Sequence, residues 1–336
     1  MEPQAIKQRI ALFSSKAYDK AVFDPIADQC GLEILHIEAR LESKTVSLAS
    51  GYDTVCAFVN DEVNTQVAEL LAALGVKHIA LRCAGYNNIN VEKCRQLGIS
   101  VSHVPAYSPQ AVAEHAMALI QTLNRRMHKA YNRVKEGNFD LNGLLGFTLH
   151  NKTIGVIGTG RIGEAFINIA NGFGCKVLCY DPYPSPDITP EKGTYTDLER
   201  LFASSDIISL HCPLTEQNKH LINSASVDRM KKGVMIINTS RGGLIDTSAL
   251  INGLKTHKIG YVGLDVYEME SELFFRDRSC EVIQDDIFQR LATFHNVLIT
   301  GHQGFFTKEA ITEIAQVTIS NIRGYWGNEI DTKRFL

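Results

Sequence analysis

The sequence predicts an α/β protein of two domains, one inserted into the other. With 336 residues, the chain is longer than a single hydrophobic core usually requires. Two series of short, β-branched apolar runs alternate with amphipathic stretches, which is typical of parallel βαβ units. A long helical pattern separates the two series, and a last helix follows the second. We therefore expect an outer domain at 1–105 and 303–336 and an inserted domain at 106–302.

The first series supplies the elements of the outer domain. Its apolar runs have the length of strands, and the stretches between them carry apolar residues at helical spacing. The predicted strands are 9–13, 32–37, 54–60, 78–83 and 99–104, and the predicted helices are 65–75 and 91–98. The series breaks at Pro105.

One long connecting helix is predicted in residues 105–138, after a Ser-Pro start. Its covered positions recur every three or four residues. They are Val112, His115, Met117, Leu119, Ile120, Leu123 and Met127. By analogy with other oligomers, we expect this helix to support a homodimer or homotetramer interface.

The second series predicts the inserted domain as a doubly wound sheet of six parallel strands. The strands are 153–158, 176–181, 206–212, 233–240, 261–266 and 296–302. A final helix at 307–326 has a covered face made of Ile311, Ile314, Ala315, Ile319 and Ile322. That face must be buried, and the simplest packing returns the helix to the outer domain.

Composition excludes several classes of protein. Hydrophobic residues make up 45% and the formal net charge is -3, so no positive field is available for nucleic acid or an anionic membrane. The eight cysteines form no CxxC pair and no spacing with histidine that indicates a metal site or a disulfide framework. No apolar run approaches the ~20 residues that span a bilayer. We expect a cytoplasmic protein without a metal ion.

The segment GVIGTGRIGEAF carries Gly158, Gly160 and Gly163 in G-x-G-x-x-G spacing, between a strand and a helix. In that context it is a dinucleotide-binding fingerprint. Gly158 permits the tight turn, Gly160 lets the backbone approach the pyrophosphate, and Gly163 lets the helix pack on the sheet. The diphosphate is expected over the helix start at Arg161 and Ile162. The inserted domain is therefore predicted to be a Rossmann domain.

Asp181 ends the strand that follows the fingerprint. A carboxylate at this place accepts both ribose hydroxyls of NAD, whereas the 2'-phosphate of NADP would meet a like charge. The alternative is a turn-former before Pro182, and the upstream glycines favour the cofactor role. We therefore expect NAD.

Three segments of the second half end a predicted strand with residues that ionise or donate. They are NTSRGGLID with Arg241, GLDVYEME with Asp265 and Glu270, and TGHQGFF with His302. Ligands of open α/β sheets collect at the carboxyl ends of strands. We therefore expect these side chains to face one cleft.

The chain resembles the NAD-specific D-2-hydroxyacid dehydrogenases from residue 53 to the final helix. The matching segments are the fingerprint, HCPLT at 211–215, NTSRGGLID at 238–246, GLDVYE at 263–268 and TGHQGFFT at 300–307. The segments ALRCAGYNNIN, VPAYSPQAVAEHA, NRRMHKAYNR and VIQDDIF look like the fermentative D-lactate dehydrogenases of that family. The resemblance implies a Rossmann NAD-binding domain inserted into a flavodoxin-like substrate-binding domain.

By this resemblance, Arg241, Glu270 and His302 are the catalytic residues of 2-keto acid reduction. Arg241 holds the substrate carboxylate with its planar fork and polarises the carbonyl, and His302 gives the proton. Because an imidazole has an unperturbed pKa of ~6.5, Glu270 on the other ring nitrogen is expected to favour the charged form. Glu268 is the competing partner for His302, and the resemblance favours Glu270.

The resemblance also implies which residues line the cofactor. Asp265 either lies by the nicotinamide amide or braces the site. His211 is expected to be a wall of the cofactor groove rather than a second acid. The other lining residues are Cys212 and Pro213 through their backbone, together with Asn218, Thr239 and Ser240.

The substrate pocket is expected to come mainly from the outer domain. The amides of Ala84 and Gly85 bind the carboxylate opposite Arg241, since glycine allows close approach. Phe58 stands where family members carry a bulky aromatic residue for small substrates, which leaves room for a methyl group. The alternative for Phe58 is ordinary strand core. Further aromatic walls are expected from Tyr107 and Phe305.

Two positions depart from the family pattern. Gly304 replaces the alanine usual after the histidine and glutamine, and Asn90 replaces an aspartate. Neither change removes a reacting group, although Gly304 is expected to loosen the packing beside His302.

The sequence thus predicts reversible reduction of pyruvate to D-lactate with NADH, with His302 as proton donor. The alternatives within the class are reductases of hydroxypyruvate, glyoxylate or phenylpyruvate. An NAD-sensing corepressor, which keeps this fold, is the alternative from another class.

Overall fold

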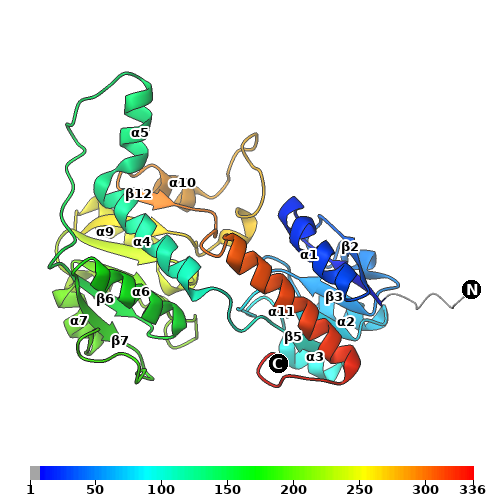
Figure 1. The fold of residues 1–336 in the computed structure, drawn as a ribbon. Helices are drawn as coiled ribbons and strands as arrows, with labels where there is room; N and C mark the ends of the chain where they lie inside the picture. The colour runs from blue at the N-terminus through cyan, green and yellow to red at the C-terminus, as the bar shows by residue number, and fades with distance from the viewer. Residues whose placement is uncertain (1–7) are drawn as a thin grey trace, which may run out of the picture. The chain divides into compact units, whose positions relative to one another are not determined.

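The computed structural model describes residues 8–336, which form two compact units (Figure 1). Unit 1 holds the residues up to 108 together with 306–336, and unit 2 holds 109–305. The sequence places these boundaries at 105/106 and 302/303, and residues 1–7 of the predicted outer domain lie outside the described residues. Both units contain a parallel sheet with helices, so the predicted α/β class is confirmed.

The sheet of unit 1 has five parallel strands in the order β2-β1-β3-β4-β5. This is the flavodoxin-like order, as predicted. The strands are β1 Gln8–Leu12, β2 Leu32–His36, β3 Thr54–Ala57, β4 His78–Leu81 and β5 Ser100–Ser102. The helices are α1 Ala17–Gln29, η1 Val46–Ala49, α2 Thr65–Ala73, α3 Val91–Gln96 and α11 Lys308–Gly327.

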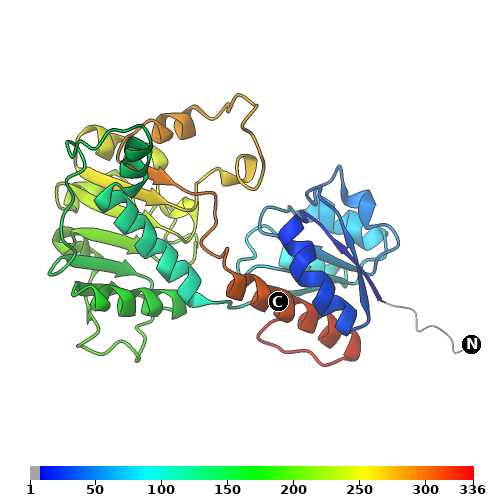
Figure 2. The same ribbon diagram turned by 45° about the horizontal axis from the view of Figure 1, so that its top comes forward.

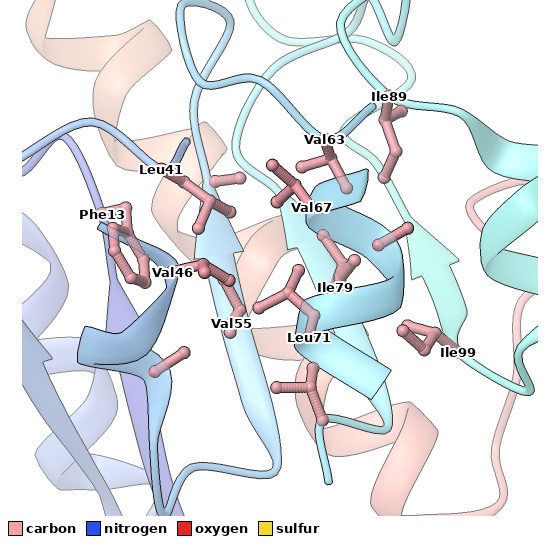
Figure 3. Packing of buried hydrophobic residues seen from close by; sticks show 14 of the residues in the cluster. Phe13, Leu41, Val46, Val55, Val63, Val67, Leu71, Ile79, Ile89 and Ile99 are labelled. Carbon is pink, nitrogen blue, oxygen red and sulfur yellow. The ribbon is translucent and has the colours of Figure 1, made fainter. Parts of the chain in front are cut away.

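A hydrophobic cluster fills one face of this sheet (Figure 3). Figure 3 shows Val55 of β3, Ile79 of β4 and Leu71 of α2 close together in this cluster. On α11, four of the five predicted face residues are buried, and Ile311 is half-buried. The helix packs on α1 and β4, and Trp326 donates a hydrogen bond to the hydroxyl of Thr54 at 3.0 Å. The C-terminal helix therefore completes unit 1.

Short polar side chains begin several helices of unit 1. Asn64 and Asn90 accept hydrogen bonds from Val67 and Lys93 at the first turns of α2 and α3. Asn90 is one of the two departures from the family pattern, and asparagine caps a helix about as well as aspartate. The exchange at residue 90 is therefore structurally neutral.

Unit 2 contains a seven-stranded parallel sheet in the order β12-β11-β10-β9-β6-β7-β8. Six of these strands were predicted, and the seventh, β8, was missed because its two residues are too short for a pattern. The strands are β6 Thr153–Ile157, β7 Lys176–Tyr180, β8 Thr194–Tyr195, β9 Ile207–Leu210, β10 Val234–Asn238, β11 Ile259–Leu264 and β12 Val297–Ile299. The strand order reverses between β6 and β9, which is where doubly wound sheets bind dinucleotides.

Two hydrophobic clusters cover the faces of this sheet. On β10, Met235 and Ile237 belong to one cluster and Val234 and Ile236 to the other, as the two-residue period of a strand requires. The cluster of Met235 and Ile237 includes residues of α4 and α6, and Figure 2 shows α4 running across the strands. The helices are α4 Pro109–Arg125, α5 Met127–Lys135, α6 Arg161–Gly172, α7 Leu198–Ser204, α8 Ser224–Arg229, η2 Gly242–Leu244, α9 Thr247–Lys255, η3 Glu270–Glu272 and α10 Asp286–Ala292.

The single long helix predicted in 105–138 is wrong. The chain forms two helices, α4 and α5, because Arg126 adopts a left-handed conformation with φ 49° between them. Met127, a predicted covered position, is consequently exposed. Sequence periodicity cannot detect such a break, since the apolar spacing continues through it.

None of the helices within residues 8–336 combines the length and apolarity required to cross a bilayer. The cytoplasmic location stays a prediction.

Candidate active site

The fingerprint glycines have the three environments that a dinucleotide-binding loop requires. Gly158 has φ 96°, and a Cβ atom there would lie 2.5 Å from the Cys212 nitrogen. A Cβ on Gly163 would lie 2.0 Å from the Gly158 carbonyl, so only glycine lets α6 approach β6 this closely. Above Gly160 a Cβ would meet nothing within 4 Å. Of the three fingerprint glycines, only Gly160 therefore has open space beside it.

The N-terminus of α6 lies at this open space. Its N-cap is Gly160, which has no side chain to cap the first turn, and Arg161 and Ile162 are its first residues. Free N–H groups at a helix start attract phosphate. The loop therefore fits a dinucleotide.

Asp181 follows β7 and contacts the fingerprint loop directly. Its Oδ2 accepts hydrogen bonds from the backbone N–H of Thr159 at 2.7 Å and from the Thr159 hydroxyl at 3.2 Å. Its Oδ1 accepts from the N–H of Tyr183, which gives the turn role that the sequence left open. Thr159 was missed as a partner, because it lies between two motif glycines and belongs to no recognised pattern.

The loop after β9 is held by its own polar groups. Asn218 donates to the carbonyl of Pro213 at 2.8 Å and accepts from the N–H of Thr215 at 2.7 Å. The side chain predicted to line the cofactor thus shapes the loop that begins with Cys212. Ser240 and Thr239 follow the neighbouring strand β10, and the Ser240 hydroxyl donates to the carbonyl of Leu210 at 2.8 Å.

His211 is excluded as a second acid. The imidazole is buried, and this burial lowers the pKa of His211 to about 3. Its Nε2 lies 2.8 Å from the hydroxyl of Ser209, and its ring packs on Phe166. His211 is therefore neutral at pH 7 and supports the loop.

Arg241, Asp265 and His302 leave three neighbouring strands at the same edge. In the sheet, Asn238 of β10 pairs with Leu264 of β11, which pairs with Ile299 of β12. The backbone N–H of His302 also donates to the carbonyl of Asp265 at 2.7 Å. The three strand ends therefore lie side by side within unit 2, and that their side chains face one cleft stays a prediction.

Arg241 is half-buried and keeps most of its donors available. One Nη1–H donates to the carbonyl of Ser240 at 2.7 Å. Within residues 8–336, no carboxylate forms an ion pair with this guanidinium. A partly buried, unneutralised guanidinium is suited to bind an anionic ligand.

His302 and Glu270 form a hydrogen-bonded pair. The distance from His302 Nδ1 to Glu270 Oε1 is 2.9 Å, and both side chains are largely buried. The other carboxylate oxygen, Oε2, accepts from the backbone N–H of Tyr267 at 3.0 Å. Phe275, which the sequence analysis missed, has its ring 5.7 Å from the imidazole. Among the described residues, Nε2 at the other end of the His302 ring has no hydrogen-bond partner.

The competing carboxylate, Glu268, is engaged elsewhere. Its Oε1 lies 2.6 Å from Nε2 of His220, and its Oε2 accepts from the hydroxyl of Thr247 at 3.0 Å. The geometry therefore selects Glu270 as the partner of His302.

Asp265 braces the loop that carries His302. Its carboxylate is 1% exposed and accepts from the N–H groups of Gln303 at 2.8 Å and Gly304 at 2.7 Å. The Thr300 hydroxyl and His115 of α4 also contact it, at 2.5 and 3.2 Å. Burial alone would raise the pKa of Asp265, but the hydrogen bonds from His115 and Thr300 outweigh it and hold the pKa at about 2.

Of the two roles expected for Asp265, the structure therefore contains the brace, and contact with the nicotinamide stays a prediction. The roles of Thr300 and His115 were missed. Both lie inside segments already assigned to a strand and a helix face, so nothing in the spacing marked them.

Gly304 packs closely against the Asp265 carboxylate. A Cβ at residue 304 would lie 3.0 Å from Asp265 Oδ2 and 3.5 Å from the ring of His115. The glycine is buried, and its N–H is bonded to the carboxylate. The expected loosening beside His302 is absent at this position, because the carboxylate and imidazole already fill the space.

The predicted substrate residues divide between the two units. Ala84 and Gly85 follow β4 in unit 1, and their N–H groups donate no hydrogen bond within the described part of the chain. Phe58 follows β3 in the same unit and is buried, and Tyr107 is half-buried. Phe305 belongs to unit 2 and is also buried.

Residues 117–304 match the model of the NAD-binding domain of the D-isomer specific 2-hydroxyacid dehydrogenases, which is more than half of the chain. The chain belongs to this family. The Escherichia coli D-lactate dehydrogenase is 52% identical over 314 residues, which cover 94% of this chain and 95% of that protein. This family membership makes the enzyme an NAD-dependent oxidoreductase, as predicted.

Solved structures of family members give the same result. The pyruvate reductase of Chlamydomonas reinhardtii superposes with a TM-score of 0.91 at 42% identity and covers 96% of this chain and 98% of its own. The Aquifex aeolicus D-lactate dehydrogenase, solved with NAD and lactic acid, has a TM-score of 0.86 at 32% identity, with coverages of 97% and 98%. The enzyme therefore has the fold of 2-hydroxyacid dehydrogenases along almost its whole length.

Proposed function

We propose that this enzyme is a D-lactate dehydrogenase, which reversibly reduces pyruvate to D-lactate with NADH. The observation that carries the proposal is the His302–Glu270 pair, at 2.9 Å, on the sheet edge that also holds Arg241. A reduction of this kind needs a proton donor for the ketone and a cation for the carboxylate. The names of the relatives, D-lactate dehydrogenase and pyruvate reductase, support the choice of substrate.

Each catalytic residue has one task in this reaction. Glu270 holds Nδ1 of His302, so Nε2 carries the proton that passes to the ketone oxygen. Arg241 binds the substrate carboxylate through its free donors. Bound NADH supplies the hydride for the carbonyl carbon, so one hydride and one proton convert the ketone to the alcohol.

The cofactor-binding residues follow from the loop geometry. The open space over Gly160 and the first amides of α6, at Arg161 and Ile162, would hold the diphosphate. Asp181 would accept the ribose hydroxyls while it keeps its bonds to the loop. The walls would come from the segments that begin at Cys212 and at Thr239.

Unit 1 is proposed as the substrate-binding domain. The unbonded N–H groups of Ala84 and Gly85 are suited to a carboxylate. Phe58 and Tyr107 of this unit would border the methyl group of pyruvate, which restricts the pocket to small 2-keto acids.

A substrate panel tests the proposed function. We expect NADH oxidation with pyruvate to show a higher kcat/KM than with hydroxypyruvate, glyoxylate or phenylpyruvate. A single methylene in an apolar pocket changes selectivity by roughly 10- to 200-fold. A bulky acid that outruns pyruvate would contradict the substrate, and tight NADH binding without turnover of any 2-keto acid would favour the corepressor.

We also propose that the enzyme is a homodimer whose contact includes α5 and the segment after it. None of the nine residues of α5 is buried. A helix this short is marginal in water without a covering surface. Six large apolar residues of α5 and the following segment are 54% to 88% exposed, and they are Met127, Tyr131, Val134, Phe139, Leu141 and Leu145. A second copy of the same surface would bury them.

Sedimentation of a charged variant tests this contact. We expect the parent enzyme to sediment as a dimer or larger assembly and Tyr131→Asp to shift toward the monomer, because a carboxylate would be desolvated at the contact. Val282→Asp is the matched control, since Val282 is also exposed but lies outside this surface. A parent that sediments as a monomer would contradict the proposal.

A further inference from the structure

A buried arginine lies at the carboxyl edge of the sheet in unit 1. Arg82 is the first residue after β4 and is 2% exposed. Its Nη2 donates to the carbonyls of Phe13 at 3.0 Å and Ser14 at 2.9 Å, just after β1, and lies 3.6 Å from Asp19 Oδ2. The charge is thus fixed two residues before Ala84, whose N–H donates no hydrogen bond within residues 8–336.

The guanidinium of Arg82 lies over the ring of Phe58, with 4.2 Å from Cζ to the ring centroid. The backbone of Phe58 is fixed as well. Its N–H donates to Asp61 Oδ2 at 2.6 Å, and its carbonyl accepts from Asn88 at 2.9 Å. Both backbone polar groups of Phe58 are therefore hydrogen-bonded, and its ring is covered by the guanidinium of Arg82.

A buried arginine is an unfavourable neighbour for a residue that only fills the core, because its charge must be desolvated. Taking a guanidinium out of water is unfavourable unless its donors are satisfied, and Arg82 Nε is buried without a partner among residues 8–336. An apolar side chain could fill the same space behind Phe58 without desolvating a charge. A planar cation over the ring face adds an electrostatic attraction to the ring that an apolar residue lacks.

We propose that Arg82 is a positioning residue for substrate size, which holds the Phe58 ring in the orientation that admits a methyl group and excludes larger side groups. The inference rests on the proposed function, since it assumes that Phe58 borders the substrate. It assigns the selectivity to the Arg82–Phe58 pair and not to the aromatic ring alone. The other charged groups around Arg82 are Asp19 and Asp61. Asp61 bonds the backbone N–H of Phe58 and the hydroxyl of Ser14, and neither carboxylate has a described contact with the Phe58 ring.

The test compares kcat/KM for pyruvate with kcat/KM for 2-ketobutyrate, which is one methylene longer. We expect the preference for pyruvate to fall about 10-fold in Arg82→Met and in Phe58→Leu. The loss should come from a higher KM for pyruvate and a lower KM for 2-ketobutyrate, with kcat nearly unchanged. The Kd of NADH should stay at the parental value. In the double variant, Arg82→Met should add little to the loss caused by Phe58→Leu, since both act on one ring.

A matched control and a conservative variant complete the design. Arg9 lies over the ring of Tyr52 at 4.5 Å in the same unit, so Arg9→Met removes a similar contact away from Phe58 and should leave the preference unchanged. If Arg82→Met fails to fold, Arg82→Lys keeps the charge but not the planar stack, and it should lose the preference in the same direction.

The outcomes separate the two proposals. A parent enzyme that reduces no 2-keto acid contradicts the proposed function. An active parent whose preference survives Arg82→Met or Arg82→Lys overturns the inference about Arg82. The inference is also overturned if Arg82→Met lowers the preference for pyruvate by the same factor in the Phe58→Leu variant as in the parent enzyme.

Discussion

Replacement of His302 by glutamine is expected to lower kcat/KM for pyruvate reduction by about 10²- to 10⁴-fold, the usual contribution of a positioned general acid. Glutamine keeps the size and one hydrogen bond of the imidazole but cannot transfer a proton. Since His302 belongs to none of the fingerprint contacts, the Kd of NADH should change little. Stopped-flow kinetics measure kcat/KM, and equilibrium fluorescence titrations measure the Kd of NADH. A variant with parental kcat/KM would show that the proton comes from another group.

Replacement of Glu270 by glutamine tests the same pair. The parental carboxylate accepts the Nδ1–H of His302 at 2.9 Å, which fixes the ring with Nε2 at its other end. A neutral amide binds the ring more weakly than a carboxylate, so kcat/KM for pyruvate reduction should fall by about 10-fold while the Kd of NADH stays at the parental value. Glu268→Gln is the matched control, because Glu268 binds His220 and Thr247. If Glu268→Gln lowers kcat/KM and Glu270→Gln does not, the assignment is wrong.

The sequence predicts the strand ends well because chemistry there is tied to backbone topology. Arg241, Asp265 and His302 each follow an apolar run, and parallel pairing places such positions at one edge. The glycine spacing works for the same reason: the tight contacts of Gly158 and Gly163 and the open space over Gly160 are backbone properties. Patterns that reflect backbone geometry can therefore be read from the sequence alone.

Side-chain partners depend on rotamers and on distant segments, and here the sequence fails. Glu268 and Glu270 lie two residues apart, so spacing alone does not choose between them; the family resemblance favours Glu270, and the structure shows that it binds His302. His115 lies far from Asp265 along the chain, and its helical spacing indicates only a covered face. The helix break at Arg126 has the same origin, since a left-handed residue leaves the apolar period intact.

Replacement of Asp265 by asparagine is expected to reduce kcat for pyruvate reduction by about 10²-fold, because a displacement of about 1 Å in a reacting group costs that much. The carboxylate accepts from the N–H groups of Gln303 and Gly304, the two residues that follow His302 in the loop. The amide group of asparagine presents donors where acceptors are needed. Two buried N–H groups would then compete for one oxygen, and the loop should relax.

Asp265→Asn is also expected to lower the free energy of unfolding in a way that depends on pH. The pKa of Asp265 is lowered in the folded state to about 2 from its ordinary value of 3.8, so its stabilising contribution is present above about pH 4 and is lost as the pH falls through 2. At pH 7 the difference corresponds to about 2 to 3 kcal/mol. Denaturant unfolding at pH 7 and pH 3 should therefore show a larger loss of unfolding free energy for Asp265→Asn at pH 7.

Asp206→Asn separates the brace from stability in general. Asp206 also accepts a backbone N–H, from Thr153, and bonds Lys231, but it lies at the opposite, amino end of the strands, just before β9. Its replacement should lower the unfolding free energy and leave kcat of the folded enzyme near the parental value. If Asp265→Asn loses stability but keeps kcat, the carboxylate supports the fold without fixing His302. The loss of both in Asp265→Asn, and of stability alone in Asp206→Asn, is what a brace behind the proton donor requires.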